Sequence, residues 1–294
     1  MTCGYNGFHN SPIRRIFEML IREFIEHLEK DERKSANTCQ SYDRDLRQMS
    51  DWISFTFGVS DPVEYSPVNL EAYYDFLVKA GKSPATISRF VASTKAFFDY
   101  LLKKGLVAFD PSASLRAPKV IRKKPSIMTE ADTVKLLSMP EDDSKGIRDR
   151  AMLELLCDTG LRVSELLGLT LKDLDLQKRQ LMVPGGRTRK IQYDKKVNKY
   201  LEEYLEKSRG ALLGTQKDEG YLFLNVSGES MSRQGFWKLI KKYGKDAGIE
   251  TELTPHVLRH SFAAHALRSG KDIKKVQSIL GHSDLSTTSG YLNM

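Results

Sequence analysis

The chain has 294 residues, of which 40% are hydrophobic and 29% charged, and 46 basic against 38 acidic side chains give a formal net charge of +8. This length exceeds that of most single domains, so we expect two domains, each with its own core. No apolar run approaches the ~20 residues of a membrane span, and the first residues lack the apolar region of a secretion signal. We therefore expect neither a membrane protein nor a secreted one. The positive charge is shared by both halves of the chain, which favours a polyanionic partner.

The three cysteines, Cys3, Cys39 and Cys157, are odd in number and share no CxxC spacing. This pattern predicts neither a disulfide framework nor a zinc ribbon. A reducing cytoplasm is therefore the expected compartment.

The first half of the chain has the periodicity of helices. Residues 1–13 are expected to be a flexible leader, and residues 14–116 a helical bundle. A first helix is predicted by apolar residues at four-residue spacing, namely Ile16, Leu20, Phe24 and Leu28. A second helix is expected from about residue 37 and a third over residues 69–79. A fourth follows Ser83-Pro84, which supplies an N-cap and a first-turn proline.

Residues 117–125 are predicted to form a basic linker, because the helical period fails and prolines punctuate this stretch. Two interpretations of its cationic side chains carry equal weight: a solvated hinge, and a segment that crosses a phosphate backbone. The two are compatible. They are Lys119, Arg122, Lys123 and Lys124.

Residues 126–294 are expected to form a mixed α/β domain. Helices are predicted near residues 129–138 and 147–158, and Gly160 ends the second of them. Two short strands at residues 180–183 and 190–193 flank a hairpin turn, and a brief strand at 221–224 is expected to complete a three-stranded antiparallel sheet. Helices return from residue 232. The predicted fold class is therefore mainly α with a small sheet.

Two arginines are candidates for binding a phosphate. A phosphodiester under attack gathers negative charge on its nonbridging oxygens, and fixed guanidinium forks suit that geometry. Arg162 lies just after Gly160, the residue that ends the predicted helix. Glu165 either holds the Arg162 guanidinium in place or forms a trivial exposed pair with it. Thr254-Pro255 begins a further helix and places His256 and Arg259 one turn apart on one face.

The histidines His256 and His260 have the i, i+4 spacing of a zinc-binding helix. However, Val257 stands where a zinc protease has glutamate, and neither a cysteine nor a carboxylate cluster follows. We therefore expect no metal. An imidazole beside a phosphate could instead move protons, since it titrates near physiological pH. His260 is assigned a structural role.

Tyr291 is the candidate nucleophile. A tyrosine hydroxyl has a reference pKa of about 10, so its attack on phosphorus needs a base or a cationic setting, which His256 or His282 could provide. A tyrosine ester would conserve the phosphodiester bond energy, so that strands could be broken and rejoined without ATP. Because no P-loop or acidic metal cluster appears in the sequence, we expect no cofactor.

Three segments together resemble the tyrosine recombinase (phage integrase) family, especially its Xer-type branch. They are Thr159–Leu166, with the sequence TGLRVSEL, Pro255–Ala263, with PHVLRHSFA, and Leu280–Thr288, with LGHSDLSTT. They occur in the family's order, and the likeness extends over residues 14–294. The helical first half is similar to the family's SAM-like core-binding domain.

The resemblance implies a DNA-breaking-rejoining enzyme fold that forms a C-shaped clamp around double-stranded DNA. It implies that Arg162, His256, Arg259 and His282 activate a phosphate that Tyr291 attacks. The product would be a 3′-phosphotyrosyl linkage and a free 5′-hydroxyl, and strands would exchange through a Holliday junction. A homo-tetramer or hetero-tetramer on two sites would be the working assembly, in the cytoplasm and associated with the nucleoid. Chromosome-dimer resolution and phage or transposon integration both remain open.

The sequence departs from the family in two places. The family's general acid is a lysine in the hairpin turn, and the ungapped register here falls on Gly186, followed by Arg187. Arginine gives up a proton less readily than lysine, so Lys190 is the expected substitute. Arg187 and Arg189 are expected to contact DNA. The second departure is the end at Met294, where Xer-type relatives usually continue into a helix that docks on a neighbouring protomer. Either the chain is truncated or its subunits communicate differently.

Two other functions fit parts of the pattern. One is a DNA-binding or architectural protein of the same fold without an effective general acid, which would form no covalent adduct. The other is a type IB topoisomerase-like activity, which would relax a supercoiled plasmid without any specific site.

Overall fold

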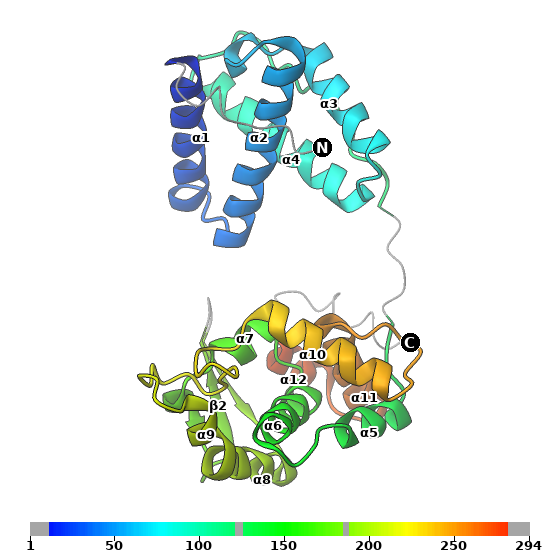
Figure 1. Cartoon of the computed structure of the whole chain (residues 1–294). Helices are drawn as coiled ribbons and strands as arrows, with labels where there is room; N and C mark the ends of the chain where they lie inside the picture. Colours follow the sequence, from blue (N-terminus) through cyan, green and yellow to red (C-terminus); the bar gives the residue numbers. More distant parts are fainter. Residues whose placement is uncertain (1–11, 121–125, 185–187, 282–294) are drawn as a thin grey trace, which may run out of the picture. The chain divides into compact units, whose positions relative to one another are not determined.

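The computed structural model describes residues 12–120, 126–184 and 188–281, with side chains from Ile16 onward. The chain divides into two compact units between Lys123 and Lys124, and each unit has its own hydrophobic core (Figure 1). Within the described residues, no helix is both long and apolar enough to cross a membrane.

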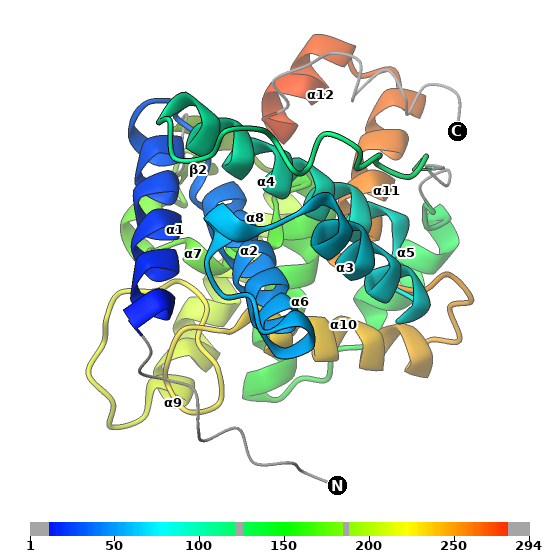
Figure 2. The same cartoon turned by 90° about the horizontal axis from the view of Figure 1, so that it is seen from above.

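In its described residues, the first unit is a bundle of four α-helices. They are α1 (Pro12–Lys30), α2 (Ala36–Phe57), α3 (Pro67–Lys79) and α4 (Pro84–Lys103). The helices α2, α3 and α4 each begin after a serine, and the side chains of Ser35, Ser66 and Ser83 accept a hydrogen bond from the backbone N–H three residues on. Such caps satisfy N–H groups that the helix leaves without a partner. The helix α2 packs against the other three (Figure 2).

The core of the first unit is rich in aromatic side chains. Leu20, Phe24 and Leu28 of the predicted α1 stripe are buried, whereas Ile16 is 43% exposed and Phe17 is buried instead. The rings of Phe24 and Phe97 meet edge to face with their centroids 5.4 Å apart, and Phe97 and Phe98 do so at 5.5 Å. This arrangement matches the positive edge of one ring to the negative face of the next.

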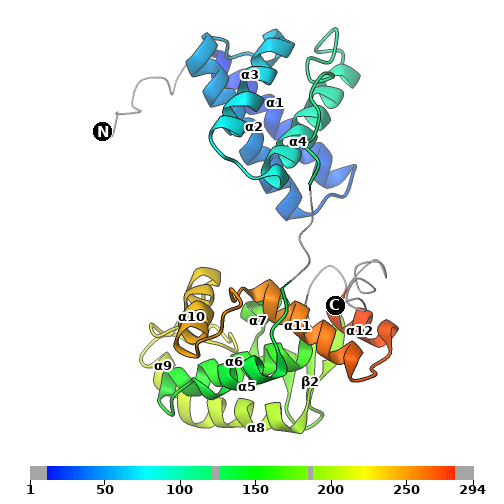
Figure 3. The same ribbon diagram turned by 90° about the vertical axis from the view of Figure 1, so that its right-hand side faces the viewer.

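The second unit combines helices with a small sheet (Figure 3). Its helices are α5 (Glu130–Ser138), α6 (Ser144–Thr159), α7 (Val163–Gly168), α8 (Lys195–Glu203), α9 (Gly210–Leu213), α10 (Arg233–Asp246), α11 (Pro255–Arg268) and α12 (Ile273–Leu280). A π-helical turn at Tyr204–Arg209 joins α8 to α9. The sequence prediction omitted the segment from α8 to α9.

The sheet has three antiparallel strands in the order β1 (Leu174–Asp175), β2 (Gln180–Val183) and β3 (Arg189–Gln192). The prediction of a three-stranded antiparallel sheet is confirmed, but its assignment of the third strand to residues 221–224 is wrong. Tyr221 and Leu224 form only isolated bridges, outside the named strands. The hydroxyl of Tyr204 accepts a hydrogen bond from the Leu224 N–H and donates one to the Leu222 carbonyl, so a side chain takes the place of a neighbouring strand.

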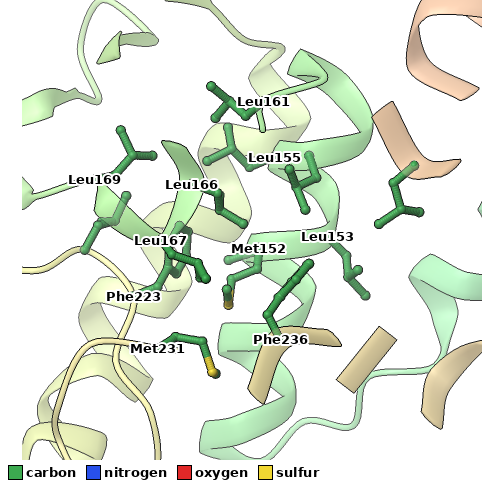
Figure 4. Packing of buried hydrophobic residues seen from close by; sticks show 14 of the residues in the cluster. Met152, Leu153, Leu155, Leu161, Leu166, Leu167, Leu169, Phe223, Met231 and Phe236 are labelled. Atoms are coloured by element: carbon green, nitrogen blue, oxygen red, sulfur yellow. The ribbon is translucent and has the colours of Figure 1, made fainter. Parts of the chain in front are cut away.

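The helix α6 lies at the centre of the second unit, and six consecutive residues from Ala151 to Leu156 are buried. Figure 4 shows Met152 and Leu155 of α6 packed among side chains that include Leu166 of α7 and Phe236 of α10. At its end, Gly160 has a φ of +59°, and a Cβ there would lie 2.3 Å from Cδ1 of Phe262. Only glycine fits this left-handed, crowded position, from which the chain turns into α7.

Candidate active site

Arg162 is the residue directly before α7. Its backbone is extended, with a φ of −68° and a ψ of 145°, and its N–H donates to Oε2 of Glu165 over 2.8 Å. Its guanidinium donates from Nη1 to Oε1 of Glu165 over 3.0 Å and from Nη2 to the carbonyl of Gly281 over 3.3 Å. The side chain is 45% exposed, so the guanidinium is held on one side and open to a ligand on the other.

Arg259 comes from the middle of α11 and is only 6% exposed. Its Nη1 donates to the carbonyl of Gly160 over 2.6 Å, and its Nη2 donates to the carbonyl of Leu280. Arg162 and Arg259 therefore meet at the adjacent carbonyls of residues 280 and 281, at the C-terminal end of α12. A helix leaves its last carbonyls without partners and carries partial negative charge there, so cations are stabilised at this end.

Glu165 lies between two arginines and is 12% exposed. Arg189 donates from Nη1 to Oε1 and from Nη2 to Oε2 of this carboxylate, over 2.9 Å in each case. Its Nε donates to the carbonyl of Ile279 over 2.9 Å. Burial raises the pKa of Glu165, but hydrogen bonds from Arg189 and Arg162 outweigh it, and the net pKa is lowered. The carboxylate is therefore ionised at neutral pH.

The two histidines of α11 have stacked rings, with centroids 6.2 Å apart and an angle of 27° between their planes. His256 is exposed in the first turn of the helix, and His260 is half-buried one turn later. Burial, and then the neighbouring His256 and Arg259, lower the pKa of His260. His260 is therefore neutral at physiological pH, whereas His256 is accessible to a ligand.

Lys190 and Arg189 leave strand β3 on opposite faces of the sheet. Arg189 points toward Glu165 and α12, whereas Lys190 is exposed and pairs across the sheet with Met182, which is 37% exposed. Successive side chains of a strand alternate between its faces. The structure therefore brings Arg162, Glu165, Arg189 and Arg259 together, and it does not bring Lys190 to them.

Two family models cover most of the chain. The phage integrase family matches residues 126–294, and the N-terminal SAM-like domain of phage integrases matches residues 21–105. The chain belongs to the phage integrase family of tyrosine recombinases. These enzymes cleave and rejoin DNA strands. The recombinase is 39% identical to tyrosine recombinase XerD of Listeria innocua over 278 residues, which is 94% of each chain.

Solved structures share the fold of this recombinase. The integrase of transposon Tn1549, in complex with circular intermediate DNA, matches with a TM-score of 0.72 and 22% identity, over 92% of this chain and 94% of that one. The XerH recombinase bound to its palindromic difH substrate matches with a TM-score of 0.71 and 19% identity, over 98% of this chain and 94% of that one. The expected fold, helical bundle and mixed domain together, is thereby confirmed.

Several predicted site residues of the recombinase lie outside the described residues. They are Tyr291, His282, Arg187, Arg122, Lys123 and Lys124. Lys119 is described and exposed. The described structure ends at Gly281, directly before His282, and the two arginines hold the carbonyls of Leu280 and Gly281 there.

A basic face on α10 of the recombinase was not predicted from the sequence. Lys238, Lys241 and Lys245 are exposed on the side of the helix opposite to the buried row of Phe236 and Ile240. A run of lysines at three- and four-residue spacing after Ser232 was the available signal, because such spacing places them on one helical face.

Proposed function

We propose that this tyrosine recombinase exchanges strands between two specific duplex DNA sites, with Tyr291 as the nucleophile. Oη of Tyr291 forms a bond to phosphorus and the bond to the 5′-oxygen breaks, which leaves a 3′-phosphotyrosyl linkage. The phenolic proton goes to a base, His256 or His282, and the departing 5′-oxygen takes a proton from a general acid. The free 5′-hydroxyl then attacks the partner strand, through a Holliday junction. The proposal needs neither a metal nor ATP.

The observation that carries this proposal is the meeting of Arg162 and Arg259 beside the end of α12. They come from separate motifs, and both donate to carbonyls directly before His282. The guanidiniums of Arg162 and Arg189 pair with one ionised carboxylate, Glu165, and Arg259 donates to the neighbouring carbonyl of Leu280. Three arginines and one carboxylate leave two positive charges at the site. Fixed positive charge of this kind stabilises the dianionic, phosphorane-like transition state more than the monoanionic ground state.

The working assembly in this proposal is a homo-tetramer or hetero-tetramer on two double-stranded DNA sites. The match of the chain to XerD relatives over both of its units supports it. The XerH recombinase is described in complex with a recombination substrate, which supports DNA as the partner here. In this proposal Lys119 and the linker cations contact the DNA backbone, and the protein works in the cytoplasm on nucleoid DNA.

A nicked suicide substrate tests the function. Sequences that the protein binds are first selected from a random duplex library. The selected duplex is then nicked a few nucleotides beyond the cleavage position. Cleavage releases a short fragment that carries the free 5′-hydroxyl, and religation is blocked when this fragment diffuses away. We expect a covalent adduct on the 3′-phosphate that survives denaturation. Salt-sensitive binding without an adduct would instead indicate an architectural protein, and relaxation of a plasmid that lacks the selected site would indicate a topoisomerase-like enzyme.

Lys190 as the general acid stays a prediction, and it requires the outer face of β3 to reach the leaving oxygen. A proton donor contributes about 10² to 10⁴-fold to a rate. We therefore expect Lys190→Ala to slow cleavage of ordinary DNA by this factor, but to have little effect on DNA with sulfur in place of the 5′-oxygen. A thiol has a pKa of about 8.5, so a thiolate leaves without a proton. Equal rates for the variant and the unchanged protein on ordinary DNA would remove Lys190 from this role.

The basic face of α10 is expected to bind the DNA backbone. Each neutralised phosphate contributes about 0.9 to the slope of log K against log salt. Lys238→Ala with Lys245→Ala should therefore make that slope shallower by about two units. The matched control is Lys195→Ala with Lys199→Ala, which removes the same charge from exposed positions of α8, on the opposite side of α6 from α10 (Figure 3). Equal slopes for the two double variants would contradict a role for α10.

A further inference from the structure

Glu165 would cancel the positive charge of Arg162 if the two formed an isolated pair. Its carboxylate accepts two hydrogen bonds from Arg162, one from the backbone and one from the guanidinium. It also accepts two parallel hydrogen bonds from Arg189. Such a fork between guanidinium and carboxylate is among the stronger interactions that either group makes. The second arginine thus supplies the charge that balances Glu165.

We propose that Arg189 is a positioning residue that neutralises Glu165 and thereby leaves the charge of Arg162 for the scissile phosphate. The inference rests on the proposed function, in which Arg162 binds that phosphate. It assigns Arg189 a role inside the protein rather than on the DNA. The side chain is only 16% exposed, and all three of its guanidinium nitrogens donate to protein oxygens.

Arg189 also fixes the spacing between α7 and the end of α12. Its guanidinium lies against the backbone of Gly281, where a Cβ would be 3.2 Å from Cζ of Arg189. The consecutive carbonyls of Ile279, Leu280 and Gly281 each accept a hydrogen bond from a different arginine. The donors are Arg189, Arg259 and Arg162, in that order. Arg162 and Arg189 both also donate to Glu165, and Arg189 does so with two parallel guanidinium hydrogen bonds.

The second unit contains a matched pair away from these residues. Arg209 donates to both carboxylate oxygens of Asp218 and to the carbonyl of Tyr221, and it is 8% exposed. It therefore has the same kind of contacts and similar burial to Arg189. Loss of this pair reports what a buried fork contributes to stability alone.

The test measures the single-turnover cleavage rate at saturating suicide substrate, the DNA affinity and the melting temperature. Arg189→Gln should slow cleavage on the order of 10 to 100-fold, less than the 10² to 10³-fold for loss of a direct donor. The affinity should stay within about twofold, because Arg189 contacts no phosphate. Arg189→Lys keeps the charge and should slow cleavage less than Arg189→Gln does. Arg209→Gln should lower the melting temperature without slowing cleavage by the folded protein.

The decisive variant adds Glu165→Gln to Arg189→Gln. The double variant has lost one charge of each sign, so Arg162 keeps its net positive charge, and we expect about tenfold of the lost rate to return. A double variant as slow as Arg189→Gln, or an Arg189→Lys variant that is equally slow, would overturn the inference. So would a salt slope shallower by about one unit in Arg189→Gln, which marks a direct phosphate contact. If the unchanged protein forms no adduct, the proposed function fails instead.

Discussion

The substitution Tyr291→Phe is expected to abolish the covalent adduct while leaving DNA affinity unchanged. It removes one oxygen, the atom that bonds to phosphorus in the proposed reaction, and keeps the aromatic ring. Loss of the nucleophile from a group of residues that act together costs at least on the order of 10⁴-fold in rate. The adduct on a suicide substrate should therefore fall below detection, and a band-shift titration should be unaltered.

Tyr200→Phe is the matched control for this experiment. Tyr200 lies on α8, a helix that Figure 3 shows on the far side of α6 from α10, and the substitution again removes only a hydroxyl. It should form the adduct at the rate of the unchanged protein. An adduct that persists in Tyr291→Phe would show that another side chain attacks the phosphate, and peptide mapping of the adduct would identify it.

The helices of the first unit were predictable because local signals mark both their faces and their ends. The serine caps before α2, α3 and α4 lie in the sequence next to the residues that they cap. The apolar rows of these helices face one core, so periodicity and packing agree. At Ile16 they differ, since a helix stripe is wide and only tertiary contacts decide which edge is buried.

The second unit was harder to predict, because the buried residues of its core do not follow a single sequence period. Leu222, Phe223 and Leu224 are buried one after another, as in a strand, yet the Tyr204 hydroxyl takes up the Leu222 carbonyl and the Leu224 N–H. This contact joins residues about 20 positions apart, and nothing local in the sequence indicates it. The segment from α8 to α9 did carry a cap at Asp194, but a π-helical turn interrupts its 3.6-residue period.

In the candidate site, too, some features have a local signal in the sequence and others do not. Arg162 and Arg259 could be selected as phosphate ligands from residue type and motif. The partners of Arg189 could not, because they depend on which face of β3 it occupies. The pairing of Met182 with Lys190 determines that face, and a shift of one residue would exchange Arg189 and Lys190. Strand register is decided across the sheet rather than along the chain.

Arg259→Ala should lower the cleavage rate on the order of 10² to 10³-fold, as expected for loss of a fixed donor to a developing charge. A guanidinium has five N–H donors in a planar fork, so one side can hold the carbonyls of Gly160 and Leu280 while another faces a phosphate. Lysine has no such fork, and Arg259→Lys should therefore recover only part of the rate.

The same substitution should also destabilise the second unit, because the carbonyls of Gly160 and Leu280 would lose the donor that Arg259 supplies. Each such group costs about 1 to 3 kcal/mol, and each kcal/mol lowers the melting temperature of a domain of this size by about 2 to 4 °C. Cleavage must therefore be measured well below the lowered melting temperature. Arg268→Ala removes an exposed guanidinium from the same helix and is the control. If folded Arg259→Ala cleaved as fast as Arg268→Ala, Arg259 would serve only to hold the end of α12 against Gly160.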